Sequence, residues 1–96
     1  MLTHIVCWKY KEGTTQEQHD NHVAKLKSLE AIINEIISLK AGADILHLDR
    51  SYDTALVITF ANREALDVYT VHPAHQEVVA IGREIAANVM SVDFID

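Results

Sequence analysis

The most easily recognised strand in the sequence, Thr54 to Phe60, is apolar on both of its faces. By alternation, the two faces carry Leu56, Ile58 and Phe60 on one side, and Ala55, Val57 and Thr59 on the other. Helices that follow such strands cover one face of the sheet, and a large bare apolar face is seldom left in water. The strand therefore predicts helices on one side and a second copy of the chain on the other, related by a two-fold axis.

Periodicity predicts six elements in the 96 residues, which form a single domain over residues 1–96. They are a strand from Thr3 to Lys11, a helix from Thr14 or Thr15 to about Asn34, a strand from Ser38 to Leu48 with a bend at Gly42, a strand from Thr54 to Phe60, a helix from Asn62 to about Ala86 that breaks at His72-Pro73, and a strand from Asn88 to Ile95. This β-α-β-β-α-β order is the ferredoxin-like arrangement. We therefore expect an α+β fold with both helices on one face of a four-stranded antiparallel sheet.

Charge and composition exclude several classes of function. The net charge of −6 and the absence of any run of three basic residues argue against nucleic acid as a partner. No signal peptide and no apolar run long enough for a bilayer are visible, so no membrane partner is expected. The single cysteine, Cys7, fits a reducing cytoplasm. No flavin, nicotinamide or phosphate fingerprint is present, and the pairs His19/His22 and His72/His75 lack a third ligand, so neither cofactor nor metal is expected.

A phenol and two imidazoles surround the only proline of the chain, within the stretch Tyr69 to His75. Pro73 favours the first position of a helix and pushes His72 towards an extended conformation, so His75 should lie in the first helical turn. The helix dipole there disfavours a positive imidazolium and would leave a neutral ring able to accept a proton. In the structural alternative, Tyr69 and His72 only brace the corner by hydrogen bonding.

The opening segment His4 to Lys11 resembles the start of the stress-responsive A/B barrel family, also called dimeric α+β barrels, and Tyr69 to His75 resembles the most recognisable motif of that family. Leu39 to Gly42 and Val92 to Phe94 resemble the second and closing strands of that family, so the similarity spans essentially the whole chain. The resemblance implies a homodimer whose two sheets form a barrel, with a cleft between each sheet and its own helices. Some plant members are stress-associated, and one plant branch cyclises polyketides.

That polyketide-cyclising branch implies roles for three residues of this chain. His75 would be the general base, Tyr69 would orient it by a hydrogen bond or stabilise an enolate, and His4 would lie opposite them on the first strand. His22 and Val23 replace larger aromatic residues of that branch, which implies a pocket of different polarity and shape. The residues expected to contact a substrate in the cleft are Val6, Trp8, His22, Val23, Leu26, Ile58 and Val78.

Three classes of function remain open from the sequence. The chain is a small dimeric stress-associated protein without catalysis, a cofactor-free cyclase or lyase that acts on a carbonyl-bearing, polyketide-like substrate, or a module that binds a small ligand in the same cleft. The geometry of His75, Tyr69 and His4 distinguishes them. Convergence on an open cavity favours the enzyme or the binder, whereas polar atoms paired only with backbone in a closed core favour the first class.

Overall fold

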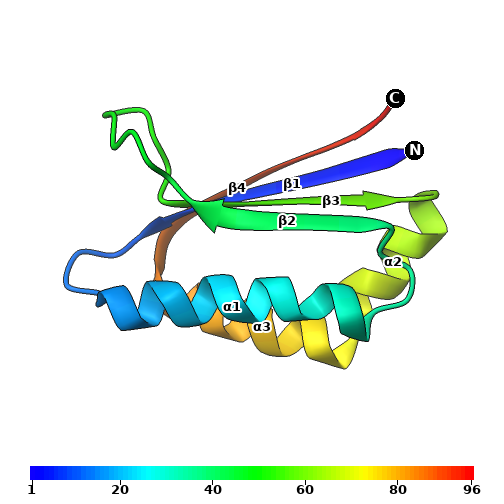
Figure 1. Cartoon of the computed structure of the whole chain (residues 1–96), viewed down its shortest axis with the longest axis horizontal. Helices are drawn as coiled ribbons and strands as arrows, with labels where there is room; N and C mark the ends of the chain where they lie inside the picture. Colours follow the sequence, from blue (N-terminus) through cyan, green and yellow to red (C-terminus); the bar gives the residue numbers. More distant parts are fainter.

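The computed structural model describes all residues, 1–96, as three helices and four strands. In chain order these are β1 (Leu2–Tyr10), α1 (Gln16–Ile32), β2 (Ser38–Ala43), β3 (Thr54–Phe60), α2 (Arg63–Val71), α3 (Pro73–Ile85) and β4 (Ala86–Ile95). The strands form one sheet in the order β2-β3-β1-β4, and every neighbouring pair is antiparallel. Figure 1 shows α1 and α3 side by side in one layer beneath the sheet, with α2 at the end of the sheet leading down into that layer. The predicted ferredoxin-like fold is confirmed.

Local side-chain chemistry explains where the helices begin. Thr15 caps α1 by a capping box, in which its hydroxyl accepts from the Gln18 amide and the Gln18 side chain accepts from the Thr15 amide. Asn62 caps α2 by accepting from the amide of Ala65. Pro73 is the first residue of α3, directly after the extended His72, so the predicted break in the second helical segment is confirmed.

Two strand boundaries differ from the sequence prediction by two residues or more, whereas β1 is displaced by a single residue at each end. β2 ends at Ala43, not at Leu48, because Asp44 begins a turn: its carboxylate accepts from the His47 amide at 2.7 Å, and His47 takes a positive φ of 53°. His47 thus lies in the loop of residues 44–53 rather than in a strand. β4 begins at Ala86, directly after α3, two residues earlier than the expected Asn88.

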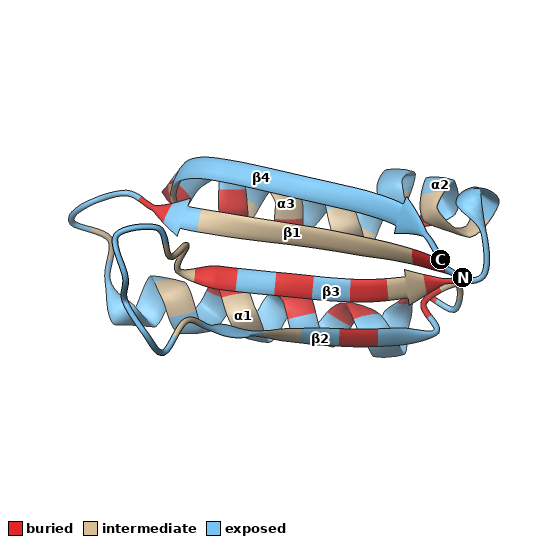
Figure 2. Cartoon of the chain, turned by 90° about the horizontal axis from the view of Figure 1, so that it is seen from above, coloured by how far each residue is buried: buried red, intermediate tan, exposed pale blue.

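The core lies between the inner face of the sheet and the helices. Leu56, Ile58 and Phe60 of β3 are at most 1% exposed, and Leu29 and Ile33 from α1 and its C-terminal end pack into the same cluster. Figure 2 shows the resulting alternation of buried and exposed residues along β3. None of the three helices has the length and hydropathy needed to cross a bilayer.

The opposite face of the sheet has no intramolecular cover. In the strand register, Ile5 lies between Val57 of β3 and Val92 of β4, and Cys7 lies beside Met90. Val57, Met90 and Val92 are 36%, 49% and 56% exposed. This surface is called the outer sheet face below. Its apolar character is the feature that the alternation of the sequence predicts.

Candidate active site

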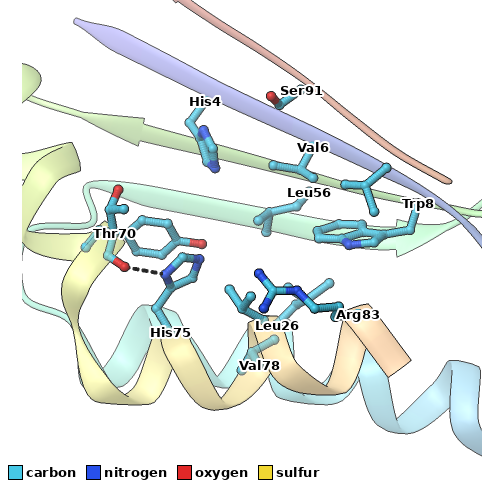
Figure 3. Close-up of a pocket in the computed structure, with 13 residues that line it drawn as sticks. His4, Val6, Trp8, Leu26, Leu56, Thr70, His75, Val78, Arg83 and Ser91 are labelled. Atoms are coloured by element: carbon cyan, nitrogen blue, oxygen red, sulfur yellow. Dashed lines mark hydrogen bonds between the residues drawn. The ribbon is translucent and has the colours of Figure 1, made fainter. Parts of the chain in front are cut away.

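A cavity of about 450 Å³ opens between the inner face of the sheet and α3 (Figure 3). It is within the size range of small-molecule sites. Its lining comes from every helix and from β1, β3 and β4: His4, Val6, Trp8, Leu26, Leu56, Tyr69, Thr70, His75, Val78, Val79, Arg83, Val89 and Ser91. Most of these side chains are apolar, so the few polar groups stand out as possible sites of chemistry.

The break between α2 and α3 positions His75. In a continuous helix the carbonyl of Thr70 would accept from the amide of Ala74, but that amide donates instead to Nδ1 of His72, which caps α3. The freed Thr70 carbonyl accepts from Nδ1 of His75 at 3.0 Å and from the Gln76 side chain at 2.6 Å. Figure 3 shows His75 held in this way and directed into the cavity.

The contact with Thr70 fixes the proton on the His75 ring. A carbonyl oxygen only accepts hydrogen bonds, so Nδ1 carries the hydrogen and Nε2 of the neutral ring is left as an acceptor. Burial lowers the pKa of His75, the Thr70 carbonyl opposes this shift, and the nearby His4 and His72 lower the pKa further. The ring is therefore neutral at pH 7. Burial is the main cause, where the sequence had suggested the helix dipole.

Tyr69 contributes a hydroxyl that no group of the chain binds. Its ring packs against His75, with ring centroids 4.1 Å apart, and against Phe60 at 5.3 Å. Burial raises the pKa of Tyr69, so the phenol stays protonated and can donate a hydrogen bond. The structure contains no hydrogen bond between Tyr69 and His75. The two rings only pack against each other, at an interplanar angle of 35°. The Thr70 carbonyl, and not Tyr69, therefore orients His75 by a hydrogen bond.

His4 projects from β1 into the opposite side of the cavity (Figure 3). Its ring lies edge-on to Tyr69, at a centroid distance of 5.8 Å. Its Nδ1 donates to the carboxylate of Asp93, the residue that pairs with His4 across β1 and β4. A carboxylate on Nδ1 holds the imidazole in one orientation and leaves Nε2 free, as in other carboxylate–histidine pairs.

Seven of the ten residues predicted for the site line this one cavity: His4, Val6, Trp8, Leu26, Tyr69, His75 and Val78. The other three lie elsewhere. His22 is fully buried, and its Nδ1 bonds the Tyr10 hydroxyl at 2.7 Å. Ile58 is fully buried in the core, and Val23 faces a separate polar hollow near the end of β1.

The sequence prediction missed other residues at the site: Leu56, Thr70, Val79, Arg83, Val89, Ser91 and, behind His4, Asp93. Every second residue of β4 lies on the same face of the strand, so Val89 and Ser91 share a face with Asp93. This alternation can be recognised in the sequence. The pairing of Asp93 with His4 depends on the strand register, which the sequence alone does not give.

Comparison with known proteins agrees with this architecture. The family model described as the Stress responsive A/B Barrel Domain matches residues 2–96. The chain belongs to this family. The stress-response A/B barrel domain-containing protein HS1 of Arabidopsis thaliana is 25% identical over 95 residues, which cover 97% of this chain and 87% of HS1.

Solved structures of similar fold include two informative neighbours of this A/B barrel chain. A dimeric ferredoxin-like protein of unknown function from Thermobifida fusca superposes with a TM-score of 0.91 at 26% identity, over 99% of this chain and 90% of that one. The hydroxynitrile lyase of Passiflora edulis has a TM-score of 0.88 at 23% identity, over 99% of this chain and 92% of the lyase. At 23% identity, the similarity to the lyase shows that the two proteins share a fold.

Proposed function

We propose that this A/B barrel protein is a cofactor-free acid–base enzyme that acts on a small carbonyl compound bound in the cavity. One observation carries the proposal: Nε2 of His75 is a free acceptor beside the unbonded hydroxyl of Tyr69, in a cavity with an apolar lining. A neutral imidazole can abstract a proton beside a carbonyl, and a protonated phenol can stabilise the negative charge that develops on the carbonyl oxygen.

The reaction that fits these two groups is enolisation. Nε2 of His75 takes the proton from the carbon next to the carbonyl, and the electron pair of that C–H bond moves into the new C=C bond of the enolate. The carbonyl oxygen gains the negative charge, and the Tyr69 hydroxyl donates a hydrogen bond to it. The Thr70 carbonyl stabilises the imidazolium formed at His75, which returns its proton to the product. Ring closure onto a second carbonyl would make the protein a cyclase.

Exchange of substrate protons tests this proposal without knowledge of the natural substrate. Deuterium uptake at the α-carbon of aryl alkyl ketones, followed by NMR in D₂O, should be accelerated by the wild-type protein. His75→Ala should lower the rate by about 10²–10⁴-fold, the usual contribution of a general base. His47→Asn removes an exposed loop histidine and serves as the matched control. Uptake that is unaffected by His75→Ala contradicts the proposal.

Tyr69→Phe tests the role of the hydroxyl separately from that of the aromatic ring. The hydroxyl has no partner in the chain, so its removal should leave the fold intact while weakening stabilisation of the enolate. The exchange rate should fall, by less than in His75→Ala.

A lyase is the second candidate function, because a base at His75 could also assist cleavage of a bond in the substrate. Hydroxynitriles should therefore be assayed as substrates. Ligand binding that no substrate converts would instead favour a binding module.

We further propose that the protein is a homodimer joined through its outer sheet faces. The Thermobifida neighbour is described as dimeric, and the outer sheet face is apolar and bare in the single chain. Figure 1 shows the loop of residues 44–53 rising on that same side, away from the helices, where Ile45 and Leu46 are 85% and 66% exposed. These side chains would contact the partner.

Light scattering tests the assembly, and a stable monomer would contradict it.

We also propose a reducing, cytoplasmic location, because the single cysteine, Cys7, cannot form a disulfide within the chain. Burial already raises the pKa of its thiol in the single chain, which keeps it protonated and unreactive. Fractionation of cells expressing the tagged full chain tests the location.

A further inference from the structure

Arg83 is the one residue with a permanent charge among the 13 that line the cavity. It makes no ion pair and no side-chain hydrogen bond in the chain, although the sequence contains 14 acidic residues against eight basic ones. Arg63 shows the usual arrangement, with its Nε 2.9 Å from a carboxylate oxygen of Asp67. Arg83 thus has five N–H donors without an acidic partner, beside the cavity.

The position of Arg83 in the last turn of α3 has a structural explanation, but the direction of its side chain does not. A basic residue near the C-terminus of a helix interacts favourably with the helix dipole. That benefit does not require the guanidinium to turn towards an apolar cavity, as Figure 3 shows it doing. Arg83 is an exposed residue that also lines the cavity, so its charge stays hydrated while its donors can reach a ligand bound there. The geometry therefore points to an anion on the ligand.

The spacing along α3 sets where this anion lies relative to the reacting carbon. Arg83 follows His75 by eight residues, so their Cα atoms are separated by about 12 Å along the helix axis. The Arg83 side chain runs back towards His75, so the guanidinium lies closer to the imidazole than the Cα atoms lie to each other. Val78 and Val79 line the cavity between them. A ligand that reaches both residues therefore has a carbonyl at one end, an apolar spacer, and an anionic group at the other end.

We propose that Arg83 binds the carboxylate of the substrate, so that the cavity selects keto acids over neutral ketones. The planar guanidinium matches a carboxylate with two parallel hydrogen bonds. A single cation at the negative end of a helix dipole suits a monoanion better than a doubly charged phosphate. The anion site specifies the substrate class of the proposed enzyme and lies in the same cavity. Measurements of ligand binding test it without any assay of catalysis.

Binding of a matched pair of probes provides the test. The probes are 6-oxo-6-phenylhexanoate, which has a ketone, a four-carbon spacer and a carboxylate, and its neutral methyl ester. Trp8 is the only tryptophan and lines the cavity, so its fluorescence reports occupancy. The wild-type protein should bind the acid about tenfold more tightly than the ester, the effect of one charge-assisted hydrogen bond at a partly hydrated site.

Variants assign that preference to Arg83. Arg83→Met should bind acid and ester equally, with an ester affinity within about twofold of the wild type, and Arg83→Lys should keep part of the preference. Arg50→Met removes the same charge from a loop outside the cavity and should leave the preference intact. Equal binding of acid and ester by the wild type, no binding of the acid, or a preference that survives Arg83→Met would overturn the inference.

The two proposals fail separately. His75→Ala should retain the preference for the acid while losing deuterium exchange. A wild-type protein that prefers the acid yet exchanges no α-protons refutes the proposed enzyme and leaves the anion site standing. A protein that catalyses exchange on neutral and acidic ketones with equal efficiency refutes the anion site alone.

Discussion

Protonation of His22 should weaken the fold as the pH falls. The ring is fully buried: Nδ1 donates to the Tyr10 hydroxyl, which donates in turn to Oγ1 of Thr54 at 2.8 Å. Nε2 has no hydrogen-bond partner. Burial, followed by the nearby His19, lowers the pKa of His22 to about 4. A second proton would place a charge in the core without a partner for Nε2.

The size of the effect follows from the two pKa values. The unfolded chain binds this proton with a pKa of about 6.5, and the folded chain with a pKa of about 4. Because the unfolded state binds the proton more tightly, the stability associated with neutral His22 is complete above pH 6.5 and is lost between pH 6.5 and about 4. The total loss is about 3 kcal/mol, at about 1.4 kcal/mol for each pKa unit.

Urea unfolding followed by circular dichroism at pH 7, 6, 5 and 4.5 measures this loss. Since other groups also titrate, the informative quantity is the difference between the wild type and His22→Gln, whose amide can still donate to Tyr10. The wild-type free energy of unfolding should fall more steeply over this range than that of the variant. Protein concentration must be held constant if the protein is dimeric. Parallel pH profiles would refute the reasoning.

Two further substitutions test packing on opposite sides of the sheet. Val57→Asp would bury an unpaired carboxylate in the proposed dimer interface, so it should cost several kcal/mol and yield monomers in light scattering; an unchanged dimer would contradict this. Gly82→Ala would place a Cβ 3.0 Å from Nε2 of His22 and 3.2 Å from Nε1 of Trp8. Such overpacking costs about 1–3 kcal/mol, partly offset by about 1 kcal/mol of helix propensity, and should shift the Trp8 fluorescence. A Gly82→Ala variant with the stability and Trp8 fluorescence of the wild type would contradict this close contact.

The sequence predicts those parts of the fold that depend on local pattern. Alternation assigned both faces of β3, and the single proline located the break between α2 and α3. Both signals are local, because a strand repeats every two residues and Pro73 lacks an amide hydrogen. The end of β2 was misplaced because the turn at Asp44 interrupts an otherwise strand-like run.

The candidate site was less predictable, because it depends on contacts between distant segments. His22 was expected to contact a substrate in the cleft, but the bond to Tyr10 that keeps it out of the cavity joins two different elements. The partnership of Asp93 with His4 requires the register of β1 against β4. Arg83 was missed because helical position alone does not say that its side chain turns into the cavity.

The pH profile of α-proton exchange tests the central claim most directly, since it reports the protonation state of the base in the working protein. If neutral His75 is the base, the exchange rate should be constant between pH 7 and 8 and fall at acidic pH, with a midpoint below 6.5 because burial lowers the pKa of His75. His75→Ala should lack this titration. A midpoint above 6.5, or the same titration in His75→Ala, would contradict the account.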